Sequence, residues 1–136
     1  MPRVPLKQKI AARITAARED VFLPREFMDL GGEDQVLRAL RQLVREKRLV
    51  KLGYGVYGRA FISRLSEAAV LSSPGGFIEA ARQTLDKLGV AWEPSQAERA
   101  YNEGRSTQIP VNPVLRIRGR FRRKLQLDNV TLMREP

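Results

Sequence analysis

The chain contains no cysteine and no histidine, and these absences exclude several kinds of chemistry. Without cysteine it has no disulfides and no thiolate metal sites. Without histidine it has no imidazole zinc site, no histidine-based triad and no use of the commonest general base. Its carboxylates are scattered and mostly stand beside basic residues. We therefore expect no enzymatic activity, no catalytic residue, no metal site, no cofactor and no small-molecule ligand.

Long apolar runs are also missing, because the longest fall well short of a membrane-spanning length. Residues 1–5 lack the apolar core of a signal peptide. We therefore expect a cytoplasmic protein with no membrane partner. The chain length of 136 residues suits one ordinary domain or two very small ones that pack on each other.

Acidic residues are few compared with basic ones. Lys and Arg number 25 against 15 Asp and Glu, which gives a formal charge of +10. A balance this basic favours a polyanionic partner such as nucleic acid or an acidic membrane surface. A ribosomal protein or a merely basic surface is the alternative interpretation.

The first part of the chain shows helical spacing interrupted by turn signals. Apolar residues at three- and four-residue steps predict helices over residues 6–18, 23–30 and 33–47, with a Gly-Gly turn before the third. Two β-prone pieces around a Gly-Tyr-Gly turn predict a hairpin over residues 49–57. This order is typical of a winged helix-turn-helix, which we expect over residues 1–60.

In that arrangement the third helix enters the major groove, which is roughly 12 Å wide and admits one α-helix. We expect four of its side chains to read bases: Gln35, Arg38, Arg41 and Gln42. Five further side chains are placed to hold the DNA backbone: Lys7, Arg45, Arg48, Lys51 and Tyr54. The alternative is a small helical core with solvated charges, since many winged helices serve protein–protein contacts.

The second part, residues 61–136, combines a helix with alternating segments. We expect a helix at about residues 75–88, a short strand at 90–92, and a polar loop over 93–106 with a helical turn at 96–101. Strands are expected within about 108–133, including a hairpin turn at Asp128-Asn129. The predicted fold class is α+β, with the N-terminal winged helix-turn-helix packed on a small C-terminal α/β module with antiparallel strands.

A cluster of basic residues lies near the C-terminus and alternates with apolar ones, which predicts a strand with one basic face. Its members are Arg116, Arg118, Arg120, Arg122, Arg123 and Lys124. No acidic cross-strand partner is evident, so the face could bind phosphates or dock an acidic protein. A charged edge strand that resists aggregation is the other interpretation.

Two blocks of sequence carry a resemblance to a known family. Residues 36–52 followed by Gly-Val-Tyr at 55–57 resemble the N-terminal domain of AbiEi-type antitoxins. Residues 94–97 followed by Ser-Thr-Gln-Ile-Pro-Val at 106–111 are similar to the family's Ser-x-Ala and Ser-Thr-Gln-Val-Pro segment. The resemblance extends over about residues 6–133.

This resemblance implies a winged-helix repressor that binds operator repeats, controls its own operon and acts as antitoxin to a nucleotidyltransferase-like toxin. The chain is shorter than the two-domain antitoxins of the family, so DNA binding transfers better than toxin neutralisation. We therefore predict a sequence-specific DNA-binding repressor that is an autoregulating antitoxin, with double-stranded operator DNA as partner. The alternatives are a module whose basic C-terminal half docks an acidic partner and an RNA-binding protein.

Overall fold

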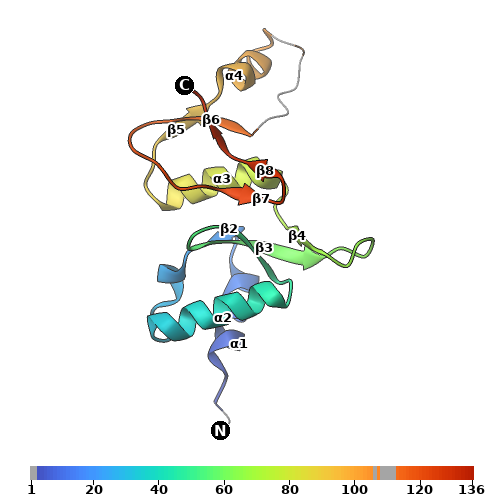
Figure 1. The fold of residues 1–136 in the computed structure, drawn as a ribbon, viewed down its shortest axis with the longest axis vertical. Helices are drawn as coiled ribbons and strands as arrows, with labels where there is room; N and C mark the ends of the chain where they lie inside the picture. The colour runs from blue at the N-terminus through green and yellow to red at the C-terminus, as the bar shows by residue number, and fades with distance from the viewer. Residues whose placement is uncertain (1–2, 106, 108–112) are drawn as a thin grey trace.

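A computed structural model describes residues 3–105, 107 and 113–136, and it shows a mixed α+β protein (Figure 1). The chain begins at one end of the molecule and finishes at the other. The elements of the first part are α1 (Leu6–Ala16), β1 (Val21–Phe22), the 3-10 helix η1 (Pro24–Phe27), α2 (Glu33–Arg45), β2 (Leu49–Gly53) and β3 (Val56–Ile62).

An antiparallel sheet forms the middle layer of the molecule. Its strand order is β1-β3-β2, and β4 (Ala69–Leu71) pairs with the outer part of β3. Lys51 lies opposite Tyr57, and Val50 lies opposite Gly58. Side chains alternate between the two faces of a strand, so each face of this sheet can bury its own apolar set.

The helices α1 and α2 cover one face of the sheet. Their apolar stripes meet in a core that includes the fully buried Ile10, Phe27, Val36 and Leu40, and Leu49 reaches it from the sheet. This core follows directly from the three- and four-residue spacing of apolar side chains in both helices.

The other face of the sheet is covered by the C-terminal part of the chain. Val50, Leu52 and Val56 from the sheet pack against Ala81 of α3 (Gly76–Lys87) and against Leu125. Figure 1 shows this layering, with α1 and α2 below the sheet and α3, β7 and β8 above it. The two parts of the chain therefore share one apolar interior.

Beyond α3 the chain builds two further small sheets and a short helix. In chain order the elements are β5 (Trp92–Pro94), α4 (Gln96–Asn102), β6 (Val114–Ile117), β7 (Gln126–Leu127), β8 (Val130–Thr131) and β9 (Met133–Arg134). One sheet is the hairpin of β7 and β8. The other has the order β5-β6-β9, in which β5 is antiparallel and β9 is parallel to β6. The expected antiparallel strands are therefore present, and the parallel pairing of β9 with β6 is an addition that the sequence did not predict.

Polar contacts join the two parts of the chain at the end of α3. The ammonium of Lys87 contacts the carboxylates of Glu19 at 2.5 Å and Glu26 at 2.6 Å. The backbone N–H of Asp20 donates to Oε1 of Gln83 at 2.9 Å. Strand β3 continues past residue 60, and the division into domains 1–60 and 61–136 stays a prediction.

Most expected helices are found, with ends shifted by one or two residues. The exception is the short helix over residues 23–30, which is one turn of 3-10 helix instead. The residues just before this turn form β1, in which Val21 and Phe22 pair with β3. Phe27 lies only five residues after Phe22 and is fully buried in the core. One tight turn makes that connection.

The short strand expected at residues 90–92 is shifted, because β5 begins at Trp92 and extends to Pro94. The helical turn expected at residues 96–101 is present as α4. The hydroxyl of Ser95 accepts from the N–H of Glu98 at 3.2 Å and caps α4. The hairpin turn at Asp128-Asn129 is confirmed. Residues 108–112 of the expected strands lie outside the described residues.

In the part of the chain that the structure describes, no helix is both long and apolar enough to cross a membrane.

Candidate nucleic-acid interface

The outward face of α2 carries the side chains predicted to read bases. Gln35, Arg38 and Gln42 lie three and four residues apart and therefore share one stripe of the helix, which Arg41 and Arg45 widen and extend. All five are exposed, whereas Val36, Ala39, Leu40 and Leu43 on the opposite side are buried. The core orients this stripe because rotating α2 would expose its apolar side.

The cations on this stripe have no ion-pair partner in the part of the chain that the structure describes. Among the described residues, no carboxylate lies within ion-pair distance of Arg38, Arg41 or Arg45. Glu33 and Asp34 instead stand in the first turn of α2, where they suit the positive end of the helix dipole. Their charges repel phosphates, so the attraction for a polyanion is strongest from Arg38 onwards.

The β2–β3 hairpin extends the basic surface of α2. Arg41 and Arg45 line a shared hollow with Lys51 and Tyr57 of the hairpin. Burial raises the pKa of the Tyr57 hydroxyl, which therefore stays uncharged beside these cations. At the tip, Gly55 has a φ of 66° and Tyr54 is 86% exposed. The side chain at the tip is therefore accessible to a partner.

Lys7 lies away from that hollow and already has an acidic partner. Its ammonium is 2.6 Å from Oε2 of Glu46, just beyond the end of α2. The hydrogen bond from Lys7 holds the pKa of Glu46 below its usual range. A phosphate would have to compete with this carboxylate for Lys7.

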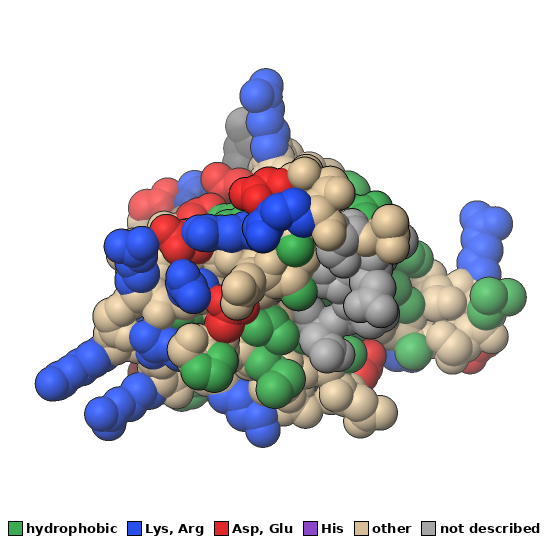
Figure 2. Space-filling view, turned by 90° about the horizontal axis from the view of Figure 1, so that it is seen from above, with side chains coloured by type: hydrophobic (Ala, Val, Ile, Leu, Met, Phe, Trp, Pro, Cys, Tyr) green, Lys and Arg blue, Asp and Glu red, His purple; other side chains and the backbone are tan. Residues whose placement is uncertain are grey.

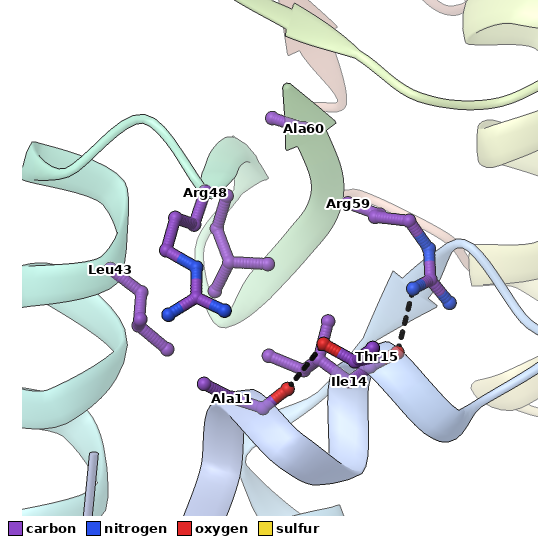
Figure 3. A pocket seen from close by; sticks show the side chains of 8 residues that line it. Ala11, Ile14, Thr15, Leu43, Arg48, Arg59 and Ala60 are labelled. Carbon is purple, nitrogen blue, oxygen red and sulfur yellow. Dashed lines mark hydrogen bonds between the residues drawn. The ribbon is translucent and has the colours of Figure 1, made fainter. Parts of the chain in front are cut away.

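Arg48 lies in a separate pocket, between α1, the end of α2 and the sheet. Figure 3 shows its guanidinium directed toward a hollow that is lined by Ala11, Ile14 and Leu43. Arg48 is exposed, but the structure does not bring it together with Arg41, Arg45 and Lys51.

Arg59 of β3 lines the other side of this pocket and was not singled out by the sequence. Its guanidinium donates to the carbonyl oxygens of Ile14, Ala17 and Glu19, each at 2.7 Å. Figure 3 shows the bond to Ile14. The same group lies 5.6 Å from the centre of the Phe22 ring. Arg59 therefore supplies hydrogen-bond donors to carbonyl groups at and just beyond the C-terminal end of α1, and it holds that helix to the sheet.

A second arginine positions the turn before α2. Arg13 forms a two-point contact with Asp29, with N–O distances of 2.7 and 2.8 Å, and also donates to the carbonyl oxygen of Glu26 at 2.8 Å. The hydrogen bond from Arg13 lowers the pKa of Asp29. An arginine on α1 with an acid sixteen positions later gives no local sequence signal, which is why the pair was not foreseen.

The predicted basic strand differs from expectation in its partners. Glu93 of β5 lies opposite Arg116 in the strand register, and its Oε1 is 2.8 Å from Nη2 of Arg118. Arg116 pairs with Glu135 at 3.3 Å. Burial acts to raise the pKa of Glu93, but the charges and hydrogen bonds of Arg118 and Arg99 together outweigh burial and lower the pKa. The expectation of no acidic cross-strand partner is therefore wrong.

The strand itself is also shorter than predicted, since β6 ends at Ile117. Gly119 has a φ of 82° and turns the chain, and Arg134 donates to the carbonyl oxygens of Ile117 at 2.7 Å and Gly119 at 2.8 Å. Four of the six basic residues follow this turn outside any strand. They are Arg120, Arg122, Arg123 and Lys124.

These four side chains are exposed, and none has a carboxylate partner within the described part of the molecule. Figure 2 views this end of the protein from above. It shows acidic side chains interspersed among Lys and Arg near the middle, while several Lys and Arg side chains project freely at the margin.

Comparison of the chain with protein-family models, with curated proteins and with solved structures finds no match.

Proposed function

We propose that this protein is a sequence-specific DNA-binding transcriptional repressor whose first part is a winged helix-turn-helix. Support comes from the order of its elements, which is helix, two-residue strand, one turn of 3-10 helix, longer helix and hairpin. In this proposal α2 enters the major groove and η1 braces it, while the β2–β3 hairpin serves as the wing.

The observation that carries the proposal is the unpaired cationic stripe on α2. Arg38 and Arg41 project from a helix that the core holds rigidly, and neither has a carboxylate partner among the residues described. Arginine pairs with the O6 and N7 atoms of guanine, and glutamine pairs with adenine, so Gln35 and Gln42 supply a second reading chemistry on the same stripe.

Backbone contacts are assigned to the neighbouring cations. Arg45 and Lys51 share the hollow between α2 and the hairpin, where a phosphate would meet two positive charges. In this proposal Tyr54, which is 86% exposed at the hairpin tip, contacts the DNA backbone or the minor groove. Such contacts set the position of the protein on the duplex without reading its sequence.

The role as an autoregulating antitoxin rests on the resemblance of residues 36–52, 55–57, 94–97 and 106–111 to AbiEi-type antitoxins. A nucleotidyltransferase-like toxin encoded in the adjacent reading frame would support this role. Repression of the shared promoter by this protein is the corresponding functional measurement.

The test of DNA recognition starts by selecting preferred duplexes from a random-sequence pool. The variant Arg38→Ala/Arg41→Ala is then compared with Arg64→Ala/Arg105→Ala, which removes the same charge from exposed positions off α2. Each base-reading arginine is worth about 1–3 kcal/mol of discrimination, or roughly 5- to 150-fold. We expect the α2 variant to lose its preference for the selected duplex and the control to keep it.

Two results would overturn the proposal: no preferred sequence emerging from the pool, or equal losses in the α2 variant and its control. Competition at equal salt between the selected duplex and a structured RNA separates DNA recognition from RNA binding. A module that docks an acidic partner through its whole basic strand has less support, because Arg116 and Arg118 are already paired internally.

A further inference from the structure

The segment from Arg120 to Lys124, here called the basic segment, lies against the hairpin that the proposed function assigns as the wing. A Cβ atom added to Gly53 of β2 would lie 2.6 Å from the carbonyl oxygen of Lys124 and 3.1 Å from Cδ2 of Leu125. Gly53 is next to Tyr54 at the hairpin tip. The end of the basic segment is therefore seated beside that tip, although about seventy residues of chain separate them.

Two apolar side chains anchor the basic segment. Leu125 is buried in the core between the sheet and α3, and Phe121 is half-buried against the same cluster. Between these anchors Arg122, Arg123 and Lys124 have no place in the core and are exposed. The anchors fix where the segment runs, while its cations remain at the surface.

The charges of the segment are concentrated and free to act on a ligand. Arg120, Arg122 and Arg123 line a hollow beside the end of α3, and no acidic side chain of the described residues pairs with them. Four like charges within five residues repel one another, and nearby anions relieve this repulsion. The hollow gives the anion a place close to three guanidinium groups.

We propose that the basic segment is a second DNA-backbone contact, which binds duplex phosphates beyond the hairpin tip. This inference rests on the proposed function, since a duplex held by α2 and the hairpin passes the tip beside which Lys124 lies. Duplex DNA is favoured over an acidic protein because its phosphates form a continuous row at close spacing, and the segment is continuous with a surface already assigned to DNA.

The test measures the salt dependence of binding to a random-sequence duplex. Each phosphate contact contributes about 0.9 to the slope of log K against log salt concentration. If both residues contact phosphates, Arg122→Gln/Arg123→Gln lowers the slope by about 1.8. The control Arg64→Gln/Arg105→Gln removes two exposed charges elsewhere, of which Arg105 is paired with Glu103 at 2.8 Å, and leaves the slope unchanged. All four positions are exposed, so both variants are expected to fold, which thermal melting checks.

An equal slope in the Arg122/Arg123 variant and the control overturns the inference. Unchanged DNA binding together with lost binding to a polyglutamate peptide also overturns it and assigns the segment to an acidic protein. These failures leave the proposed function intact as long as the Arg38/Arg41 variant loses its preference for the selected duplex. Conversely, failure to select any duplex overturns the proposed function. The salt dependence of binding to random-sequence DNA still tests the basic segment in that case.

Discussion

Replacing Arg59 by alanine tests how α1 is held to the sheet. The guanidinium of Arg59 makes three hydrogen bonds at 2.7 Å to carbonyl oxygens of Ile14, Ala17 and Glu19, at and beyond the end of α1. Its Nε is 3.5 Å from a carboxylate oxygen of Asp20. Alanine removes all of these contacts at once and leaves the carbonyl groups to be solvated by water.

The expected loss follows from the nature of these bonds. A hydrogen bond to a charged group contributes about 1.5–3 kcal/mol to stability. The Arg59 side chain is 21% exposed, and water can reach the freed carbonyl oxygens in part, so the three bonds do not contribute their full sum. We expect Arg59→Ala to lower the free energy of unfolding by about 3 kcal/mol, a large share of the roughly 5–15 kcal/mol typical of a domain.

Urea denaturation followed by circular dichroism measures this change. Arg59→Lys is the graded comparison: a single ammonium cannot form the same fork of bonds, so we expect roughly half the loss. Arg64→Ala is the matched control, because Arg64 is exposed beyond β3 and should change stability by no more than about 0.5 kcal/mol. A loss for Arg59→Ala as small as that of the control would refute the reasoning.

Three further predictions concern packing, charge and pH. Leu40→Ala removes a fully buried side chain and should cost about 2–5 kcal/mol in urea denaturation; a cost below 1 kcal/mol, roughly that of a single methylene, would contradict the buried placement of α2. Lys87→Met removes the contact to Glu26 at 2.6 Å and should cost about 1–2 kcal/mol in the same assay, an effect that vanishes if the two parts do not share this junction. Arg118 and Arg99 outweigh burial and lower the pKa of Glu93, so its stabilising effect is present above the unfolded value of about 4.3 and is lost as pH falls through the lower folded value. Glu93→Gln should therefore lose less stability than the unsubstituted protein between neutral pH and about pH 2, and an equal loss in both would count against these ion pairs.

The helices of the first part were predictable because their signal is local. Apolar residues recur with the helical period in α1 and α2, and the Gly-containing turn at Gly53–Gly55 identifies the hairpin. Strand β1 escaped prediction because two residues carry no periodicity. The basic strand was overextended because alternation of Arg with apolar residues continued past Gly119, where a positive φ turns the chain.

The candidate site was predicted only where a single helix carries it. Gln35, Arg38, Arg41 and Gln42 are exposed on α2, as its period requires. The sequence could not show that Arg48 and Arg41 lie in different hollows. Their positions depend on how α2 packs against α1 and the sheet, which are distant segments of the chain.

The sequence by itself determined the α+β fold class, because helical and strand periods are properties of neighbouring residues. It also determined the net charge of +10, which follows from composition alone. Only the tertiary structure decided which charges are available to a partner. Glu135 pairs with Arg116, and Glu93 pairs with Arg118. The close approach of the Lys124 backbone to Gly53, in contrast, places Lys124 beside the hairpin tip. Ion pairs and close backbone contacts depend on distances in space, and residues far apart in the chain acquire those distances only when the sheet and its two covering layers assemble.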